Sequence, residues 1–259
     1  MLKVSLLGCG NIGRFILKFA SQGIVNYEII SVFDVDVEKV LGVREELGMG
    51  FDVVTNIDNL VKGCDLVVEA ASQDAIRDYS IRILEANRNL MVLSVGALSD
   101  ENLWKNIMKV AKERNLKVYI PSGAILGLDG LVAAKISRIY SVSLVTRKPP
   151  STLGIETDRE VVVYNGTSKE GVRKFPFNVN VAATLGLAGI GLEKTRLKIV
   201  ADPKVKENIH EIHVIGDFGE FKIMTRNVPS PNNPKTSLIT ALSAIATLNR
   251  ISANVEIGT

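Results

Sequence analysis

The chain is 259 residues long, with 46% apolar and 23% charged residues, a balance that excludes a disordered or low-complexity protein. Its 31 Lys and Arg against 28 Asp and Glu leave a net charge of only +3, and without a basic block or aromatic-rich stripe we expect no nucleic-acid partner. No apolar run is long enough to span a bilayer and no cleavable apolar leader follows the N-terminus, so we expect a cytoplasmic protein without a membrane contact.

The chain has two cysteines, Cys9 and Cys64, and each lies at the end of an apolar segment. They lack the CxxC or Cys/His spacing of a zinc site, and two thiols in a cytoplasmic protein rarely form a disulfide. We therefore expect both to be buried as small apolar side chains, and we predict no metal site.

The N-terminal half of the chain alternates short apolar segments with longer segments of helical spacing. The predicted strands are Val4–Leu7, Ile29–Phe33, Leu66–Val68, Leu90–Leu93 and Lys117–Ile120. The predicted helices are Ile12–Gln22, Val37–Leu47, Ala75–Ala86 and Glu101–Arg114. Continuous apolar strands that alternate with helices are typical of a parallel sheet covered on both faces. The sequence therefore predicts a doubly wound α/β domain over residues 1–121.

Beyond Pro121 the pattern changes to longer strands, several of which alternate polar and apolar residues. The predicted elements are strands at Arg138–Thr146, Glu160–Tyr164, Thr195–Ala201, Asn208–Ile215 and Glu220–Arg226, and helices at Leu131–Ile136 and Val181–Leu187. This favours an α+β domain with a mixed or antiparallel sheet over residues 122–237. Helical spacing of apolar residues from Leu238 to Ile251 predicts a terminal helix, within about 238–259, that packs back on the first domain.

The segment Gly8-Cys9-Gly10-Asn11-Ile12-Gly13 lies between the first predicted strand and the first predicted helix. This GxGxxG pattern is the fingerprint of a Rossmann-type dinucleotide site, because the glycines permit a tight turn, close approach of a pyrophosphate and close helix packing. The amides of the helix N-terminus then receive the negative charge. We therefore predict that a dinucleotide cofactor binds at Gly8, Gly10, Asn11, Ile12 and Gly13.

The second predicted strand ends at Asp34, 21 residues beyond the third glycine, which is the spacing of the acidic residue that bonds the adenosine ribose. A carboxylate there repels a 2′-phosphate, and no Arg or Lys follows it directly, so the sequence favours NAD, with NADP as the alternative. Asp34 as a cap of the next helix is the competing interpretation. Ala70 and Ala71 follow another predicted strand, where small residues let a nicotinamide pass close to the backbone, and we expect both to bind cofactor.

Several segments after the first domain are richer in Gly, Asn, Pro and Ser/Thr than packing requires. They are Pro121–Asp129, Phe175–Ala183, Asn208–His213 and Asn227–Ser237. With the GCGNIG segment and Thr146–Pro150, this ordered set resembles the L-aspartate dehydrogenase family over nearly the whole chain, from Lys3 to about Ser243. Leu126 and Arg226 depart from the family pattern without removing a proposed chemical group.

The resemblance implies NAD(P)-dependent oxidative deamination of L-aspartate to iminoaspartate, which hydrolyses to oxaloacetate and ammonia, or the reverse amination. It also implies a supply of iminoaspartate for NAD biosynthesis. Carried across by motif, Ala124 and Asn180 correspond to cofactor-contacting positions of the family, and His210 to its proposed active-site histidine. Ser122, in the same turn as Ala124, is an expected substrate contact.

The residues themselves support a catalytic His210. Oxidising an amine by hydride transfer needs a side chain that exchanges a proton with nitrogen near neutral pH, and histidine is suited to this. The chain has two histidines, His210 and His213. If Asn208–Ile215 is a strand, His210 shares a face with Ile212 while His213 points the opposite way, so the two cannot ligate one metal. We expect His210 to serve the site and His213 to be structural or solvated.

A dicarboxylate substrate needs cationic or amide-rich anchors, and the start of the terminal helix is the predicted place for them. Asn233 fits an N-cap and Pro234 the first helical position. The first turn would then hold Lys235, Thr236 and Ser237 at the positive end of the helix, where a carboxylate is stabilised. We therefore predict that these three residues bind the substrate, with a plain capped helix start and a solvated lysine as the alternative.

Two other functions stay open from sequence alone. One is another hydride-transfer enzyme, of the dihydrodipicolinate reductase or homoserine dehydrogenase type, although the His-His-Lys cluster of the former is absent from the sequence. The other is a nicotinamide-nucleotide sensor without catalysis, against which His210 and Lys235 argue. The partners we expect are the small-molecule substrate and further copies of the chain, most simply one that completes a dimer.

Overall fold

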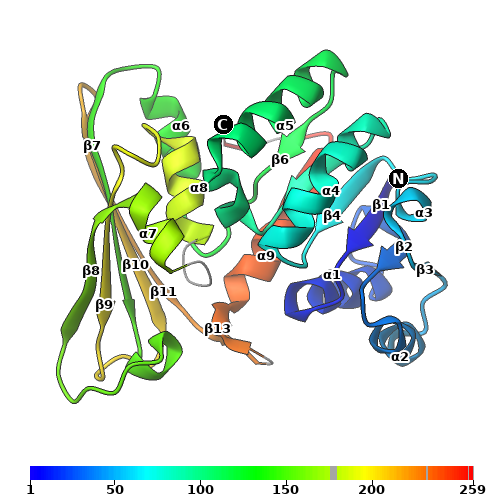
Figure 1. Cartoon of the computed structure of the whole chain (residues 1–259), viewed down its shortest axis with the longest axis horizontal. Helices are drawn as coiled ribbons and strands as arrows, with labels where there is room; N and C mark the ends of the chain where they lie inside the picture. Colours follow the sequence, from blue (N-terminus) through cyan, green and yellow to red (C-terminus); the bar gives the residue numbers. More distant parts are fainter. Residues whose placement is uncertain (176–179, 232, 256, 259) are drawn as a thin grey trace. The chain divides into compact units, whose positions relative to one another are not determined.

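The computed structural model describes residues 1–175, 180–231, 233–255 and 257–258. Contacts between residues divide the chain into two units, which differ in the kind of sheet they contain (Figure 1). Unit 1 comprises residues 1–121 and 241–256, and unit 2 comprises residues 122–240 and 257–259. The chain returns from unit 2 to unit 1 inside its last helix, α9 (Leu238–Ile251).

Unit 1 is built on a six-stranded sheet in which all neighbouring strands are parallel. Its strands are β1 (Leu2–Leu7), β2 (Tyr27–Phe33), β3 (Asp52–Val54), β4 (Leu66–Glu69), β5 (Asn89–Val92) and β6 (Val118–Tyr119). The order β3-β2-β1-β4-β5-β6 reverses between β1 and β4, and in doubly wound sheets a ligand lies at the carboxyl ends of the strands around such a switch. The predicted doubly wound sheet is confirmed, and β3 is an addition to it.

Helices connect these strands. They are α1 (Asn11–Ser21), α2 (Val37–Leu47), α3 (Ile57–Leu60), α4 (Gln73–Glu85) and α5 (Glu101–Glu113), together with a 3₁₀ turn at Val95–Ser99. Helix α5 begins where predicted, because the Asp100 carboxylate accepts hydrogen bonds from the amides of Asn102 and Leu103 at 2.9 and 3.0 Å. From α9, Ile245 and Leu248 join the apolar core that holds β1 and α1, so the predicted return of the terminal helix to the first domain is confirmed.

Unit 2 is built on a five-stranded mixed sheet. Its strands are β7 (Ile139–Lys148), β8 (Val161–Thr167), β9 (Arg196–Ala201), β10 (Asn208–Gly216) and β11 (Gly219–Asn227). In the order β11-β10-β7-β9-β8, the pair β7–β9 is parallel and the other pairs are antiparallel. This confirms the predicted mixed sheet. Burial alternates along β7 and β10, so the sheet has a buried inner face and a wetter outer face.

Three helices among the described residues cover the inner face of this sheet (Figure 1). They are α6 (Leu128–Ala134), α7 (Ser168–Lys174) and α8 (Asn180–Ala188), and a 3₁₀ turn at Pro150–Leu153 follows β7. Glycines let these helices approach closely: a Cβ on Gly186 of α8 would lie 2.9 Å from the Leu192 side chain, and one on Gly171 of α7 would lie 2.5 Å from Leu197. Helix α6 begins three residues before its predicted start, and α7 lies outside the predicted helices.

The segment before α9 corrects one prediction. Residues Asn233–Ser237 form a strand, β13, that pairs with β12 (Pro229–Ser230) in a small antiparallel ribbon. The predicted helix start with Asn233 as N-cap is therefore wrong, and α9 begins at Leu238. Pairing with the preceding chain outweighs the local capping signal, and a proline without an N–H is tolerated at the edge of such a ribbon.

This correction changes the surroundings of the predicted carboxylate anchors. Lys235, Thr236 and Ser237 belong to the extended ribbon and not to a helical first turn. The amide that begins α9, that of Leu238, donates to the carbonyl of Val228 at 3.0 Å and is already bonded. The side chains of residues 233–235 lie outside the described part of the structure.

Candidate active site

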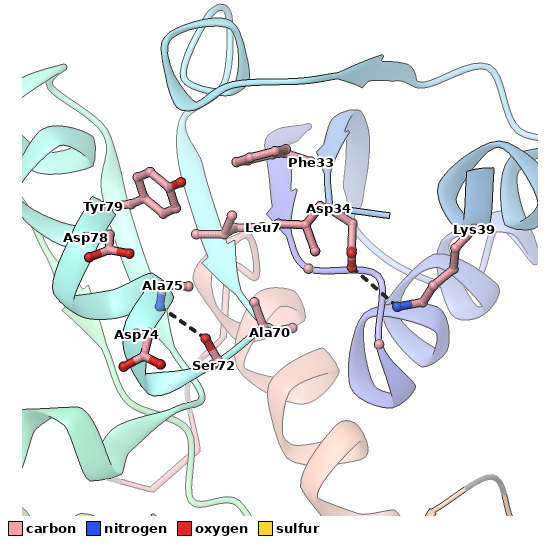
Figure 2. Close-up of a pocket in the computed structure, with 14 residues that line it drawn as sticks. Leu7, Phe33, Asp34, Lys39, Ala70, Ser72, Asp74, Ala75, Asp78 and Tyr79 are labelled. Atoms are coloured by element: carbon pink, nitrogen blue, oxygen red, sulfur yellow. Dashed lines mark hydrogen bonds and ion pairs between the residues drawn. The ribbon is translucent and has the colours of Figure 1, made fainter. Parts of the chain in front are cut away.

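A cavity of about 410 Å³ lies at the carboxyl ends of β1, β2 and β4, where the strand order of unit 1 reverses. Figure 2 shows Leu7, Phe33 with Asp34, and Ala70 lining it from the ends of these three strands, and Tyr79 lining it from α4. Doubly wound sheets bind their ligands at this position. The cavity is therefore the candidate cofactor site of unit 1.

The three motif glycines differ in what would happen if they carried a side chain. Gly8 has φ +102°, and a Cβ there would lie 2.7 Å from the amide nitrogen of Ala71. A Cβ on Gly13 would collide with the carbonyl of Gly8, so this glycine sets the approach of α1 to the turn. A Cβ on Gly10 meets the protein no closer than 3.9 Å, at Ala70, and Gly10 lines the cavity. Gly10 thus leaves room for a ligand, whereas a side chain at Gly8 or Gly13 would disturb the turn itself.

Helix α1 presents its N-terminus beside this turn. Gly10 occupies the N-cap position without a side-chain cap, and the first turn holds no acidic residue. The amides of the first helical turn and the positive end of the helix dipole suit a pyrophosphate. Asn11 and Ile12, the first two helical residues, lie at this end, as the motif predicted.

Asp34 follows β2 and holds the glycine-rich turn in place. Its Oδ2 accepts a hydrogen bond from the Cys9 amide at 2.6 Å and contacts Lys39 Nζ at 3.4 Å, and its Oδ1 accepts from the Asp36 amide at 3.0 Å. Helix α2 is capped by Asp36, whose side chain accepts from the Lys39 amide at 3.1 Å. The interpretation of Asp34 as the helix cap is therefore wrong.

The Asp34 carboxylate stays ionised at neutral pH. Burial raises its pKa, but the backbone hydrogen bonds from Cys9 and Asp36 and the charge of Lys39 outweigh burial and hold the pKa below its ordinary value. Lys39 also lines the cavity (Figure 2). Lys39 was not predicted from the sequence, because it lies five residues beyond Asp34; the signal that could have found it is a lysine in the first turn of the following helix.

A buried carboxylate, Glu69, ties the loops after β4 and β5 together. It accepts hydrogen bonds from the Ala71 amide at 2.8 Å, the Ser94 amide at 2.9 Å and the Ser94 hydroxyl at 2.7 Å. Burial raises the pKa of Glu69, although the hydrogen bonds oppose this shift. Sequence reasoning missed this role, for which the signal is an acidic residue closing an apolar strand. Glu69 fixes the backbone of Ala70 and Ala71 where they line the cavity.

The residues present fit a dinucleotide. A turn with room over Gly10, uncapped helix amides and an ionised carboxylate at the end of β2 are the three parts such a ligand requires. Unit 1 thus brings together all cofactor contacts predicted within it. They are Gly8, Gly10, Asn11, Ile12, Gly13, Asp34, Ala70 and Ala71.

Unit 2 has a cluster of buried polar side chains at one end of the inner face of its sheet. Its members are Thr146 and Lys148 of β7, Asn208 and His210 of β10, and Thr225 and Asn227 of β11. The register aligns His210 with Thr146 on one side and Thr225 on the other. Buried polar groups cost stability unless they are bonded, so this inner polar cluster points to function more than to packing.

His210 is the member of the inner polar cluster whose ordinary pKa lies closest to neutral pH. It is 3% exposed, and its Nδ1 lies 3.1 Å from the Thr146 hydroxyl. Burial, reinforced by the positive charge of Lys148, lowers the pKa of His210 to about 3. His210 is therefore neutral at neutral pH, and Nε2 is its acceptor nitrogen when Nδ1 carries the hydrogen and donates to Thr146.

His213 lies on the opposite face, as the strand alternation predicts. Its Nε2 pairs with Glu220 Oε2 at 2.6 Å on the wetter side of the sheet. Burial follows the same alternation, since Ile212 and Val214 are buried with His210 whereas Glu211 is exposed. The two histidines therefore have separate surroundings.

The other predicted residues of unit 2 lie at different distances from the cluster. The carbonyl of Ala124 accepts hydrogen bonds from Asn227 Nδ2 at 2.8 Å and the Thr225 hydroxyl at 3.3 Å, so the turn that contains Ser122 is tied to the cluster. Ser237 reaches it through Asn208, whose Nδ2 donates to the Ser237 hydroxyl at 3.4 Å. Thr236 is half-buried beside it, and Asn180 is the exposed first residue of α8.

Among the described residues, no group of three or more His, Cys, Asp or Glu side chains could hold a metal ion. No helix in that part of the chain is long and apolar enough to cross a membrane.

A doubly wound unit with a dinucleotide cavity, followed by an α+β unit with a buried histidine in a polar cluster, is typical of an NAD(P)-dependent oxidoreductase. Comparison with family models agrees: residues 8–121 match the model described as homoserine dehydrogenase, NAD binding domain, and residues 129–251 match aspartate dehydrogenase, C-terminal. The chain belongs to the L-aspartate dehydrogenase family, as the relatives described next show.

The similarity to named relatives extends over the full length. The L-aspartate dehydrogenase of Methanosarcina barkeri is 44% identical, with 100% of both chains covered. That of Methanothermobacter thermautotrophicus is also 44% identical, covering 100% of this chain and 99% of the relative. The crystal structure of aspartate dehydrogenase from Thermotoga maritima has a TM-score of 0.83 at 30% identity, covering 100% of this chain and 99% of that one.

A more distant structure shares only the fold. The myo-inositol dehydrogenase of Lactobacillus casei, solved in complex with NAD(H) and myo-inositol, has a TM-score of 0.63 at 13% identity, covering 100% of this chain and 88% of that one.

Proposed function

We propose that this protein oxidises L-aspartate to iminoaspartate with NAD(P), and that it also catalyses the reverse amination. The observation that carries the proposal is a buried neutral histidine, His210, in a polar cluster on a chain whose other unit has a dinucleotide cavity. Full-length relatives named L-aspartate dehydrogenase support the choice of substrate. A further proposal, from the family resemblance alone, is that the product iminoaspartate feeds NAD biosynthesis.

The chemistry divides into a hydride and a proton. The hydrogen on C2 of aspartate leaves with both electrons of the C–H bond, and the nicotinamide, when bound, supplies the acceptor for it. The nitrogen loses a proton as the C=N bond forms, and we assign this proton to His210 Nε2. Water then adds to C2 of the imine and ammonia leaves, which gives oxaloacetate. His210 can return its proton to the imine nitrogen and then take a proton from that water, so that the nitrogen leaves as ammonia.

For the cofactor we propose NAD, with NADP as a second substrate. The motif residues Gly8 to Gly13 contact the pyrophosphate and Asp34 the adenosine ribose, with Ala70 and Ala71 beside the nicotinamide end. The family resemblance adds Ala124 and Asn180 as cofactor contacts. Lys39, at 3.4 Å from the Asp34 carboxylate, reduces the repulsion that a 2′-phosphate would meet there.

The test of the cofactor assignment is an Asp34→Ser variant. Loss of hydrogen bonds to a charged group costs about 1.5–3 kcal/mol, so NAD should bind roughly ten-fold or more weakly, and NADP should be affected less. Asp36→Ser is the matched control, because it removes a neighbouring carboxylate, leaves a hydroxyl that can still cap α2, and keeps Asp34 in place. An unchanged NAD/NADP ratio of dissociation constants in Asp34→Ser would remove this residue from the ribose site.

For the substrate we propose contacts from Ser122, Lys235, Thr236 and Ser237. The hydrogen bond between Ser237 and Asn208 supports a place for the β12–β13 ribbon next to the inner polar cluster. Lys235→Met should raise KM for aspartate and leave the affinity for NAD unchanged, since the lost interaction is mostly ground-state binding. If titration shows weaker NAD binding and unchanged aspartate binding, Lys235 does not hold the substrate.

The test of the reaction is NADH formation with a panel of amino acids. A rate with L-aspartate supports the proposal, and a rate with a different substrate instead supports a related hydride-transfer enzyme. Tight NAD binding without any rate would identify a nucleotide sensor. A cytoplasmic location stays a prediction that fractionation of cells can test.

We propose in addition that the protein forms a homo-oligomer, most simply a dimer. Exposed apolar side chains on the outer face of the unit 2 sheet support this, among them Met224 of β11 and Ile215 of β10. Light scattering after size-exclusion chromatography measures the mass directly. A monomer at micromolar concentration would overturn the proposal.

A further inference from the structure

Among the described residues that line the dinucleotide cavity of unit 1, Lys39 is the one cation. The other charged residues of this lining are Asp34, Asp74 and Asp78. Figure 2 shows Asp74 and Asp78 on α4, across the cavity from Asp34 and Lys39. Asp74 is paired with Arg77 at 2.6 Å, outside this lining. An anionic group that enters beside Asp34 therefore meets carboxylates on both sides, and Lys39 is the residue that can attract it.

The carboxylate of Asp34 is fixed in place by the backbone. Its Oδ2 accepts a hydrogen bond from the Cys9 amide at 2.6 Å, and its Oδ1 accepts one from the Asp36 amide at 3.0 Å. The Asp34 side chain is only 12% exposed. The start of α2 is fixed in a similar way, because the amide of Lys39 donates to the Asp36 carboxylate at 3.1 Å. Loss of the Lys39 side chain would therefore leave both the carboxylate and the helix start where they are.

The ammonium group of Lys39, by contrast, is held loosely. Its Nζ lies 3.4 Å from Asp34 Oδ2, whereas a strong hydrogen bond between an ammonium and a carboxylate is about 2.7–2.9 Å long. The Lys39 side chain is 35% exposed, and an ion pair of this kind contributes little to stability. Its four-carbon stem rotates freely, so Nζ can leave Asp34 for a stronger anion at little cost.

The two dinucleotide cofactors make different demands on the residues around Asp34. The adenosine ribose of NAD offers two hydroxyl groups, which a carboxylate can accept as hydrogen-bond donors. NADP carries a phosphate in place of the 2′-hydroxyl, with a charge of about −1.5 to −2 at pH 7, and a carboxylate repels it. A fixed carboxylate with a movable lysine beside it can satisfy both ligands, because the lysine can contact either the carboxylate or the phosphate.

We propose that Lys39 determines whether the protein accepts NADP: its ammonium group turns from Asp34 to bind the 2′-phosphate directly, and it stays with Asp34 when NAD is bound. This inference rests on the proposed function, which places the adenosine ribose beside Asp34, and it names the residue that decides between the two cofactors. Lys39 is then a ligand of the phosphate, rather than a charge that only weakens the repulsion from Asp34. Asp34 favours NAD, and Lys39 adds NADP to what the cavity can bind.

The experiment measures binding to the full-length protein and needs no turnover. The probes are ADP-ribose and 2′-phospho-ADP-ribose, which reproduce NAD and NADP without the nicotinamide. Isothermal titration calorimetry gives the two dissociation constants, whose ratio reports the 2′-phosphate alone. Lys39→Met should weaken binding of 2′-phospho-ADP-ribose at least about ten-fold, the order of a lost hydrogen bond to a charged group. Binding of ADP-ribose should change by less than about two-fold, because only a loose ion pair of Asp34 is lost.

Two further variants separate a direct contact from a general attraction. Lys39→Arg keeps a cation that binds phosphate well and should restore the affinity for 2′-phospho-ADP-ribose. The matched control is Arg14→Met, because Arg14 is a cation in the first turn of α1 that pairs with Glu46 at 2.6 Å and is not among the described residues that line the cavity. This control should leave the ratio of dissociation constants unchanged. An equal loss in Arg14→Met and Lys39→Met would contradict a direct contact of Lys39.

Three results would overturn the inference about Lys39. They are a parent protein that does not bind 2′-phospho-ADP-ribose, unchanged binding of this probe in Lys39→Met, and an equal loss of both probes in that variant. Failure of the proposed function is distinguishable from these. If the probes behave as expected and the parent oxidises no aspartate with either cofactor, the proposed function alone is rejected. If the parent oxidises aspartate with NADP and Lys39→Met keeps the same KM for NADP, the inference about Lys39 alone is rejected.

Discussion

The two faces of the unit 2 sheet carry the same pair of residue types and treat them in opposite ways. On the outer face, His213 pairs with Glu220 at 2.6 Å, and Arg147 pairs with Glu160 at 2.5 Å and with Asp202 at 2.9 Å. On the inner face His210 meets a neutral hydroxyl, and Lys148 is a buried cation whose pKa falls through burial. The strands β7 and β10 place one histidine and one cation on each side.

This difference shows how a sheet separates stability from chemistry. Charges that are paired at a wet surface add little to stability. Burial of a titratable group lowers stability and shifts its pKa, as it does for His210 and Lys148, and the protonation state of such a group responds to whatever binds beside it. The outer pairs therefore belong to the surface, and the inner pair has the properties of a reactive site.

The largest expected effect that tests this comparison is on kcat. Removal of a general acid–base typically costs about 10²–10⁴ in rate, so His210→Ala should lose kcat by that order and retain NAD binding. His213→Ala should behave almost as the parent, because it loses only an exposed pair with Glu220. Steady-state kinetics with aspartate measure both. Parent-like kcat in His210→Ala, or a large loss in His213→Ala, would reverse the assignment of the faces.

The next effect is on acid stability. The unfolded chain binds a proton at histidine below pH 6.5, whereas His210 in the folded chain does so only below a pKa of about 3. Between these values the free energy of unfolding falls by about 1.4 kcal/mol for each pH unit of acidification, or about 3 kcal/mol by pH 4. His210→Gln should flatten this dependence in urea titrations from pH 4 to pH 7. His213→Gln is the control, and an equal flattening there would show that burial of His210 is not the cause.

The two cations should respond to removal with opposite signs. Burial lowers the pKa of Lys148 to about 8, so the charged side chain opposes folding at pH 7, and Lys148→Met should raise the free energy of unfolding by about 1–3 kcal/mol. Arg147→Met should lower it by about 1 kcal/mol, because the largely buried Asp202 loses its partner. Urea unfolding at pH 7 measures both. A destabilised Lys148→Met would mean that the inner cation holds the fold together.

The sequence predicted those features that depend on local periodicity. Alternation along β10 was sufficient to put His210 and His213 on opposite faces, and the glycine spacing was sufficient to locate the turn after β1. Both rest on a few consecutive residues, whose geometry is nearly fixed by the strand or the turn. The resemblance to a family supplied the substrate, which periodicity does not encode.

The features that the sequence did not predict depend on pairing between distant segments. Thr146 and His210 are 64 residues apart, and their contact follows from the register of β7 and β10. The ribbon of β12 and β13 replaces a helix start that local signals at Asn233 favoured. The pKa of His210 depends on burial and on Lys148, neither of which is visible in one strand.

The smallest expected effect concerns the orientation of the His210 ring. Thr146→Val removes the hydroxyl 3.1 Å from Nδ1 at nearly constant volume, and the loss of a hydrogen bond worth about 1 kcal/mol should lower kcat roughly five-fold. KM for aspartate should stay unchanged, since Thr146 positions the histidine and does not bind the substrate. Thr146→Ser keeps the hydroxyl and should restore kcat, which a defect of packing would not allow.

The matched change on the outer face is Ser143→Ala. Ser143 lies on the same strand, and its hydroxyl donates to the His213 carbonyl at 3.5 Å. Because this hydrogen bond is long and therefore weak, its removal should change kcat by less than about two-fold. Comparing kcat for these three variants under one set of conditions isolates the inner hydroxyl. If Thr146→Val retains the parent kcat, the bound substrate alone orients the ring, and the inner face contributes burial and charge but no positioning hydrogen bond.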